Sequence, residues 1–329
     1  MFSLFFITFA PMKTIILRKG VVLSEPHVAT IGCFDGVHGG HRLLIRTVMQ
    51  AAKERGLESA LITFDRQPQE LFDPTFRPQL LSTQKEKEAL LQALGVDHLV
   101  VLPFTREMAG LTAQAFMQRI LRDRLNVKML VTGYDNRFGR NRSEGFDDYV
   151  RYGRDLGIEV VRGDEEKFPG TEEAVSSSAI RQLLQEGKVE LMPECLTRLY
   201  SLTGKVIPGE HIGHELGFPT ANLALDDSNK LVPAPGVYVV WAVMDNERMP
   251  AIMNIGMRPT FHGSRQTLEV HILNKTGDFY GRMLTVEFVE RLRSEIRFET
   301  REALVSQLRK DRDQALTILQ QFASKKETI

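Results

Sequence analysis

The chain has 329 residues, more than one hydrophobic core usually covers, and this length favours two domains. Its 42 basic and 42 acidic residues cancel, which excludes a global field that attracts nucleic acid or an anionic membrane. Hydrophobic residues at 43% and charged residues at 26% are ordinary for globular proteins and exclude collagen-like, disordered and membrane classes. Two cysteines are too few for a disulfide scaffold, so we expect a cytoplasmic protein. The balanced charge predicts neither nucleic-acid nor membrane partners.

The first ten residues form an apolar run, Met1–Ala10, that lacks a basic leader. The run is also far shorter than the roughly 20 residues that cross a bilayer. Met12 precedes a strand-like stretch, Ile15–Leu17. We therefore expect residues 1–11 to be a disordered extension or to lie upstream of a true translation start at Met12.

Short apolar runs alternate with longer helical patterns from Val28 to Val161, which is typical of a parallel sheet with crossover helices. The predicted strands are Ala29–Ile31, Ala60–Phe64, His98–Leu102, Met129–Thr132 and Glu159–Val161. The predicted helices are Arg42–Arg55, Lys85–Leu94 and Ala113–Leu125. We expect an α/β domain over residues 1–186.

The pattern changes beyond Leu199, where short apolar strands are separated by turn-rich segments. The predicted strands here are Val237–Val243, Pro250–Asn254, Leu268–Leu273 and Leu284–Phe288. Apolar residues at near-helical spacing between Thr300 and Phe322 predict a final helix. We expect residues 187–329 to form a small antiparallel β-barrel closed by this helix, with the domain boundary near Gln185–Cys195.

The strongest local signal is a strand end that runs through a glycine-rich turn into a helix, Ile31–His41 (IGCFDGVHGGH). Such a turn aims backbone N–H groups and a helix N-terminus at a nucleotide phosphate. His38 and His41 can then donate hydrogen bonds to an α-phosphate during nucleotidyl transfer. The alternatives are a helix cap or half of a metal site, but no partner cluster stands at metal-ligand spacing. The strand-turn-helix context favours phosphate binding.

A second polar segment, Gly133–Ser143 (GYDNRFGRNRS), follows a predicted strand. Within it, Asp135 can orient a phosphate indirectly or contact a metal ion, and Arg137 can pair with a phosphate. Either side chain can equally form a salt bridge within the loop.

A third segment, Val175–Arg181 (VSSSAIR), stands before a helical run. Ser176, Ser177 and Ser178 can cap that helix and offer hydroxyl and N–H groups to β- and γ-phosphates. Arg181 adds a fixed positive charge that suits a leaving pyrophosphate. A serine-rich helix start is by itself more often a simple cap, so the function depends on its combination with the two histidines.

In the second half, glycines are spaced through Gly204–Gly209 and Gly213–Asn222, which we expect to form a loop between strands. The segment lacks the Gly-Lys-Ser/Thr ending of the common P-loop. Further on, Glu269 and His271 alternate with apolar neighbours, so they should share one face of a strand. The glycine-spaced segment is therefore not the common P-loop, and the polar face of the strand carries Glu269 as a candidate base.

Gly32–His41 resembles the HxGH signature of nucleotidyltransferases, in the form used by bacterial bifunctional riboflavin kinase/FAD synthetases. The second and third segments resemble that family's further N-terminal motifs. The resemblance implies a Rossmann-like domain that adenylylates FMN to FAD and releases pyrophosphate, with His38 and His41 as catalytic residues. The nucleotide- and flavin-binding residues that it implies are Gly32, Phe34, Asp35, Gly36, Gly40, Asp135, Arg137, Ser176, Ser177, Ser178 and Arg181.

Gly217–Asn222 (GFPTAN) resembles the Pro-Thr-Ala-Asn motif of riboflavin kinases, as do the segments that follow. The resemblance implies that Thr220 and Asn222 hold ATP and Mg²⁺, which prefers oxygen ligands. It implies that Glu269 takes the proton from the ribityl 5′-hydroxyl of riboflavin during attack on the γ-phosphate. The other binding residues that it implies are Gly209, Gly213, Gly217, Pro219, Asn254 and Arg258, with Arg297 or Phe298 beside the isoalloxazine ring.

Two positions depart from the family pattern. Gln67 stands where the family commonly has histidine, which removes a titratable donor from that loop. His214 stands where the family often has arginine, and imidazole holds phosphate less firmly than guanidinium does. The second departure predicts weaker nucleotide binding by the kinase half.

The ordered motifs favour an enzyme that converts riboflavin to FMN and FMN to FAD with ATP. We expect it to be monomeric or weakly self-associating. One alternative is an FMN adenylyltransferase with a weakened kinase, suggested by His214. Another is a non-catalytic flavin-binding regulator. A regulator has no need for His38, His41 and Glu269 together, and the chain has no recognisable DNA-binding segment.

Overall fold

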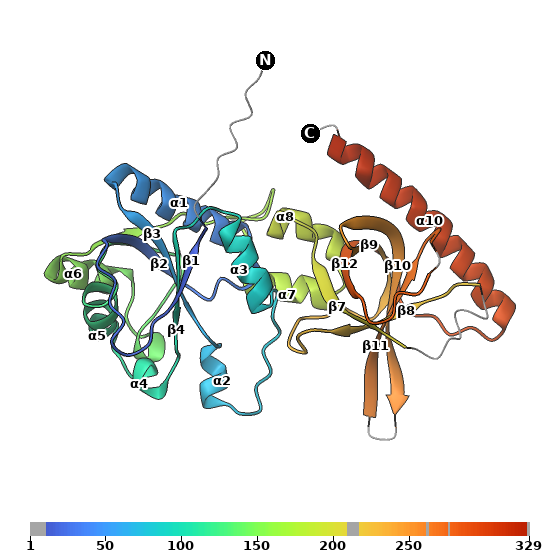
Figure 1. The fold of residues 1–329 in the computed structure, drawn as a ribbon, viewed down its shortest axis with the longest axis horizontal. Helices are drawn as coiled ribbons and strands as arrows, with labels where there is room; N and C mark the ends of the chain where they lie inside the picture. Colours follow the sequence, from blue (N-terminus) through green and yellow to red (C-terminus); the bar gives the residue numbers. More distant parts are fainter. Residues whose placement is uncertain (1–10, 209–216, 261–262, 276, 328–329) are drawn as a thin grey trace, which may run out of the picture. The chain divides into compact units, whose positions relative to one another are not determined.

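A computed structural model of the protein describes residues 11–208, 217–260, 263–275 and 277–327 (Figure 1). The chain divides into two compact units, the first ending at Ser176 and the second beginning at Ser177. No helix in the described ranges is long and apolar enough to cross a bilayer.

The first unit contains a six-stranded parallel sheet of order β1-β4-β3-β2-β5-β6. Its strands are β1 (Lys13–Ile16), β2 (His27–Ile31), β3 (Glu58–Phe64), β4 (His98–Leu102), β5 (Val127–Thr132) and β6 (Glu159–Arg162). Its α-helices are α1 (Gly39–Arg55), α2 (Pro68–Phe72), α3 (Gln84–Gln92), α4 (Arg106–Ala109), α5 (Ala113–Phe116) and α6 (Phe146–Leu156). The predicted α/β fold with a parallel sheet is confirmed.

Both faces of this sheet are covered, so the central strands are largely buried and mostly apolar. Strand β2 is buried at every position. On one face, Val28 packs in a core that includes Leu44 and Ile45 of α1. On the other face, Ile31 shares a core with Phe116 of α5 and Tyr149 of α6. The sheet and its two layers fix the carboxyl end of β2, where the glycine-rich turn begins.

One predicted helix, Ala113–Leu125, differs in detail from the structure. The α-helical part ends at Phe116, and a π-helical stretch continues it through Met117–Arg122. The wider turn places Met117, Ile120 and Leu121 in the buried core.

The second unit is a closed antiparallel barrel of strand order β10-β11-β8-β7-β12-β9. Its strands are β7 (Ser201–Ile207), β8 (Ala221–Leu225), β9 (Gly236–Met244), β10 (Glu247–Thr260), β11 (Gly263–Ile272) and β12 (Met283–Arg293). Its α-helices are α7 (Ser177–Gln185), α8 (Met192–Leu196) and α10 (Arg301–Glu327). The predicted small barrel with a closing helix is confirmed.

The apolar face of α10 covers the barrel strands. Ala315 and Leu319 of α10 pack with Val237, Val239 and Ile252 in one buried cluster. Val237 and Val239 alternate along β9, so the intervening residues of that strand face the barrel interior. The helix therefore packs on the outer surface of the barrel.

The prediction that Gly204–Ile207 belong to a loop is wrong, because these residues form the second half of β7. Gly204 lies against β8, where a Cβ atom would stand 2.2 Å from the carbonyl oxygen of Ala224. Glycine here permits a close approach of two strands, which explains why a loop-like residue occurs inside a strand.

Two candidate active sites

The glycine-rich turn of the first unit lies at the carboxyl end of β2. A 3₁₀ turn (Asp35–Val37) follows the strand, and α1 begins at Gly39. The backbone is left-handed at Phe34 (φ 51°), Gly36 (φ 79°) and Val37 (φ 43°). A β-branched residue rarely adopts this conformation, and such strain of about 1–3 kcal/mol persists only where the surroundings impose it. Val37 is fully buried, so packing holds the strained turn in place.

Asp35 anchors this turn to the segment before α3. Its carboxylate accepts hydrogen bonds from the backbone N–H groups of Leu81 at 3.0 Å and Ser82 at 3.0 Å. The Ser82 hydroxyl in turn accepts from the N–H of Gly36 at 2.9 Å. Asp35 was predicted to bind nucleotide, and the structure shows its carboxylate engaged by the protein's own backbone.

His38 and His41 lie together at the start of α1. Their rings stack with centroids 3.7 Å apart. His38 is the N-cap, since its Nδ1 accepts from the backbone N–H of His41 at 3.4 Å. The Nδ1 atom of His41 is buried and has no hydrogen-bond partner among the described residues. The capping and phosphate-binding interpretations of the pair are therefore compatible, because the cap leaves the His41 ring available.

Burial holds the pKa of His41 well below its usual value, and the nearby His38 and the ammonium of Lys87 lower it further. His41 is therefore a neutral imidazole at neutral pH. A neutral ring still carries one N–H donor, which can be offered to a developing oxyanion.

Three predicted residues shape the space around these rings. The Phe34 ring meets His41 edge-on, with centroids 5.4 Å apart. A Cβ atom on Gly32 would lie 3.3 Å from the Phe34 ring. A Cβ atom on Gly40 would lie 3.3 Å from Cε1 of His38 and 3.2 Å from the carbonyl oxygen of Val175. The last contact brings the start of the third motif against the histidine turn.

Lys87 of α3 is a residue of this site that the sequence did not indicate. It is buried, and its Nζ donates to the carbonyl oxygen of Cys33 at 3.3 Å. Burial lowers the pKa of this lysine. It stands in a run of alternating charges (QKEKE), where nothing distinguishes it from a solvated helix face. Lys87 therefore supplies a cation beside the turn that is predicted to bind a nucleotide phosphate.

The second motif follows β5, beside the carboxyl end of β2 in the sheet. Asp135 and Arg137 are exposed there. Between them, the Asn136 amide donates to the carbonyl oxygen of Ile31, which ties this loop to the end of β2. Phe138 is buried and stacks on Tyr149 at 4.2 Å. Ligands of open α/β sheets bind at this edge, outside the carboxyl ends of the strands.

The third motif spans the join between the two units. Ser176 closes the first unit, while Ser177 and Ser178 open α7 and Arg181 lies within it.

Gln67, the departure from the family pattern, begins α2. Its backbone N–H donates to the Glu70 carboxylate at 2.7 Å. The backbone of Gln67 makes this cap, so it would be kept by any residue other than proline at this position.

The barrel unit places Glu269 in a row of polar residues across three strands. Backbone register pairs Glu269 of β11 with Asn222 of β8 on one side and Asn254 of β10 on the other. Directly paired residues project to the same face, with Cβ atoms about 4.5–5.5 Å apart. All three are half-buried. The predicted base therefore has an amide neighbour on each side.

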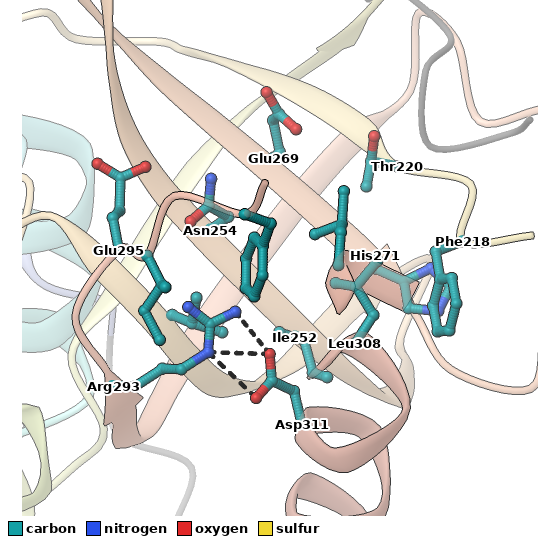
Figure 2. Close-up of a pocket in the computed structure, with 14 residues that line it drawn as sticks. Phe218, Thr220, Ile252, Asn254, Glu269, His271, Arg293, Glu295, Leu308 and Asp311 are labelled. Carbon is teal, nitrogen blue, oxygen red and sulfur yellow. Dashed lines mark hydrogen bonds and ion pairs between the residues drawn. The ribbon is translucent and has the colours of Figure 1, made fainter. Parts of the chain in front are cut away.

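Glu269 and Asn254 line a cavity of about 370 Å³ between the barrel and α10. Figure 2 shows Glu269, Asn254 and Thr220 along one side of this cavity. Leu304 and Leu308 of α10 form part of the opposite wall. The volume falls in the range of about 300–1,000 Å³ that suits small-molecule ligands.

A second cavity of about 360 Å³ also lies within the barrel unit. Pro219, Thr220, Lys275 and Tyr280 contribute to its lining. Thr220 lines both cavities. It is therefore the residue at which ligands of the two cavities can meet.

A buried ion pair closes the far side of the first cavity (Figure 2). The Arg293 guanidinium donates to both oxygens of Asp311 at 2.7–3.2 Å, and Gln307 donates to the same carboxylate at 2.8 Å. The Asp311 side chain is only 3% exposed. The pair fixes α10 to the end of β12. The sequence did not indicate it, because its partners stand 18 residues apart on a strand and on a helix.

The predicted sharing of one face by Glu269 and His271 is confirmed, since both line the first cavity. Nδ1 of His271 donates to the carbonyl oxygen of Pro219 at 2.8 Å, and burial lowers the pKa of this histidine. His271 therefore supports the backbone that carries Thr220.

The remaining predicted residues are placed as follows. Phe298 lines the first cavity, whereas Arg297 is exposed and does not contribute to the lining. Gly217 adopts a left-handed conformation with φ 78°. Gly209, Gly213, His214 and the side chain of Arg258 lie outside the described residues.

Family models match both halves of the chain. A model of FAD synthetase matches residues 22–179, and a model of riboflavin kinase matches residues 196–319. The bifunctional riboflavin kinase/FMN adenylyltransferase of Escherichia coli K12 is 36% identical over 88% of this chain and 91% of that one. The chain belongs to the bifunctional riboflavin kinase/FMN adenylyltransferase family. The predicted pair of transferase activities, with the FAD synthetase region first, is thereby confirmed.

Other members and a solved structure agree over a similar length. The riboflavin kinase/FMN adenylyltransferase of Pseudomonas fluorescens is 37% identical over 86% of this chain and 90% of that one. The crystal structure of a Streptococcus pneumoniae protein described as a macrolide-efflux protein has a TM-score of 0.82 at 30% identity. It covers 91% of this chain and 97% of its own, so the family fold extends over both units.

Proposed function

We propose that the barrel unit transfers the γ-phosphoryl group of ATP to riboflavin at Glu269, and that the α/β unit adenylylates the resulting FMN at His38 and His41. The observation that carries the kinase assignment is the row Asn222–Glu269–Asn254, which lies beside the residue common to both cavities. The stacked histidines at the end of β2 support the second assignment.

In the kinase step, riboflavin occupies the cavity beneath α10 and ATP occupies the neighbouring cavity. The 5′-hydroxyl of riboflavin reaches the γ-phosphate near Thr220, which borders both. Glu269 accepts the hydroxyl proton as the new O–P bond forms and ADP leaves. Pro219 lines the second cavity. The family motif adds Gly209, Gly213, Gly217 and Arg258 as proposed phosphate-binding residues.

Mg²⁺ fits the donor set of this site. The Thr220 hydroxyl and the Asn222 amide oxygen are hard oxygen ligands, and they lie two residues apart at the start of β8. Mg²⁺ takes few protein ligands, and when bound it would neutralise negative charge on the substrate phosphates. Thr220 and Asn222 are the residues that would hold it.

In the adenylyl step, a phosphate oxygen of FMN attacks the α-phosphorus of ATP. The bond to the β-phosphate breaks, and pyrophosphate leaves without a covalent enzyme intermediate. His38 and His41 donate to the α-phosphate, and the Lys87 cation favours the anion at this turn. The residues proposed for the remaining phosphate and flavin contacts are Gly32, Phe34, Gly36, Gly40, Asp135, Arg137, Ser176, Ser177, Ser178 and Arg181.

The setting proposed for both steps is the cytoplasm. Cys33 is exposed and Cys195 is buried, and neither forms a disulfide. Free thiols suit a reducing compartment.

The test is a time course of purified protein with riboflavin and Mg-ATP, in which riboflavin, FMN and FAD are separated chromatographically. Glu269→Gln should stop FMN formation and still convert supplied FMN to FAD. His41→Ala should accumulate FMN. The matched control is Glu287→Gln, which removes a barrel-strand carboxylate paired with Arg248 outside both cavities. Unchanged FMN formation by Glu269→Gln would refute the proposed base.

A further inference from the structure

The amino-terminal edge of the parallel sheet carries a cluster that neither reaction uses. His27, Glu58 and His98 are the first residues of β2, β3 and β4. These strands are neighbours in the sheet (Figure 1), so their starts share one edge. The histidine turn leaves β2 at the opposite edge. The cluster is therefore separate from the adenylylation site.

The three side chains converge closely. One possible ligand atom from each lies within 4.8 Å of the others. Nε2 of His98 is 2.6 Å from Oε2 of Glu58, and Nε2 of His27 is 3.8 Å from the same oxygen. The side chains of His27 and His98 are 1% and 7% exposed, whereas that of Glu58 is 41% exposed. Two buried imidazoles thus face one partly exposed carboxylate.

The tautomer of His27 follows from its partner. Its Nδ1 lies 2.9 Å from the carbonyl oxygen of Leu125, which can only accept, so Nδ1 carries the proton. Nε2 is then an acceptor, and it is buried without a hydrogen-bond partner among the described residues. It faces the Glu58 oxygen, which is also an acceptor. Two lone pairs that face each other repel, and a cation between them would convert both into ligands.

We propose that His27, Glu58 and His98 form a binding site for Zn²⁺. Two imidazoles and one carboxylate are a zinc ligand set, with the fourth position left for water. A histidine that ligates zinc typically donates its other N–H to a carbonyl or carboxylate, as His27 does to Leu125. Nitrogen ligands suit Mg²⁺ poorly, so this site is distinct from the magnesium requirement proposed for the reactions.

To accept the ion, the ligand atoms, which lie within 4.8 Å of one another, must draw together, and the proton that Nε2 of His98 donates to Glu58 must leave that nitrogen. Zinc bonds of about 2.0–2.2 Å place tetrahedral ligand atoms roughly 3.4 Å apart. The Glu58 oxygen must therefore withdraw from His98 by less than about 1 Å, which its exposure permits. The bound ion would join the starts of three central strands. It would stabilise the α/β unit because the unfolded chain does not hold the three ligands together.

The test uses the full chain, stripped of transition metals and kept in excess Mg²⁺. Zinc titration by calorimetry should give one tight site, and added zinc should raise the unfolding temperature. Glu58→Gln and His98→Gln each remove a proposed ligand, so each should weaken zinc binding by at least the roughly 10- to 100-fold that loss of an outer-shell partner costs. Glu159→Gln is the matched control, because it removes a carboxylate at the start of β6 that pairs with Arg55. The titration is repeated in His41→Ala to remove a contribution from the catalytic histidines.

Equal zinc affinity in wild type and Glu58→Gln would overturn the proposal and leave the cluster as a buried histidine–glutamate pair. X-ray absorption of zinc bound to the wild-type chain keeps the test independent of variant folding. A shell with two imidazole nitrogens and oxygen supports the site. A sulfur ligand, or a shell without imidazole, contradicts it.

Discussion

Glu269 of the barrel and His41 of the α/β unit are both half-buried, but different structures hold them in place. Glu269 is positioned by strand register, with a paired residue on each side. His41 follows a left-handed turn that depends on the buried Asp35 and Lys87. A site built on a sheet is fixed by many backbone hydrogen bonds, whereas a site on a turn depends on a few side-chain anchors. Substitutions remote from the reacting atoms should therefore affect adenylylation more selectively.

The largest effect is expected at the ion pair of Arg293 and Asp311, which anchors α10 beside the kinase site. Asp311→Ala leaves the Arg293 guanidinium without its buried partner, which we expect to cost about 3–5 kcal/mol of stability. FMN formation should fall with a raised KM for riboflavin, because α10 loses its attachment to β12. Chemical denaturation and steady-state kinetics measure the two effects. Asp313→Ala, an exposed aspartate paired with Arg312, should change neither.

Asp35→Ala tests the turn directly. It leaves the N–H groups of Leu81 and Ser82 unsatisfied, at an expected cost of about 2–4 kcal/mol in the stability of the α/β unit. FAD formation should drop while FMN formation stays at the wild-type rate. Asp123→Ala, on the surface beside Arg122, is the control. A parallel loss of both activities would contradict the separation of the two sites.

Gly40→Ala should give a smaller effect, seen in rate more than in stability. The added Cβ presses on His38 and on the carbonyl of Val175. Alanine also favours the helix by up to about 1 kcal/mol, which offsets part of the strain. We expect slower FAD formation with a nearly unchanged unfolding midpoint. Gly145→Ala, where the Cβ meets open space, should leave the rate unchanged.

The smallest effect concerns pH. Burial and neighbouring cations lower the pKa of His41 in the folded state, so below the unfolded-state value of about 6.5 the unfolded chain binds more protons. Stability should therefore fall as pH drops below about 6.5, by at most about 1.4 kcal/mol per pH unit from this residue. His41→Gln should reduce this slope in urea titrations from about pH 7 to pH 5. An unchanged slope would show that His41 is not the group responsible.

Much of this architecture was predictable because local patterns agree with the global fold. The alternation of apolar runs and helical segments indicated the parallel sheet, and the period of two around Glu269 indicated its face. Residues that act through tertiary contacts gave no such signal. Lys87 is one charge among several, and the partners Arg293 and Asp311 come from a strand and a helix.

The lack of a local signal for tertiary contacts also explains two further differences between the prediction and the structure. The cluster of His27, Glu58 and His98 comes from three strand starts, so no short spacing reveals it. The sequence predicts a loop at Gly204. Only the close approach of Ala224 on the neighbouring strand shows why the strand requires glycine there.

The placement of α7 limits how this protein can be divided into separate enzymes. The FAD synthetase model extends to residue 179, within α7, yet the carbonyl of Leu184 in this helix accepts from the N–H of Ala234 in the barrel unit. Cutting after Ser176 would give a first fragment without Ser177, Ser178 and Arg181. Cutting after α7 would remove from the second fragment a helix that packs on it. With the nucleotide-binding roles proposed above for Ser177, Ser178 and Arg181, we expect a free-standing version of each enzyme to need the helix in both fragments, and so a duplicated segment of the gene.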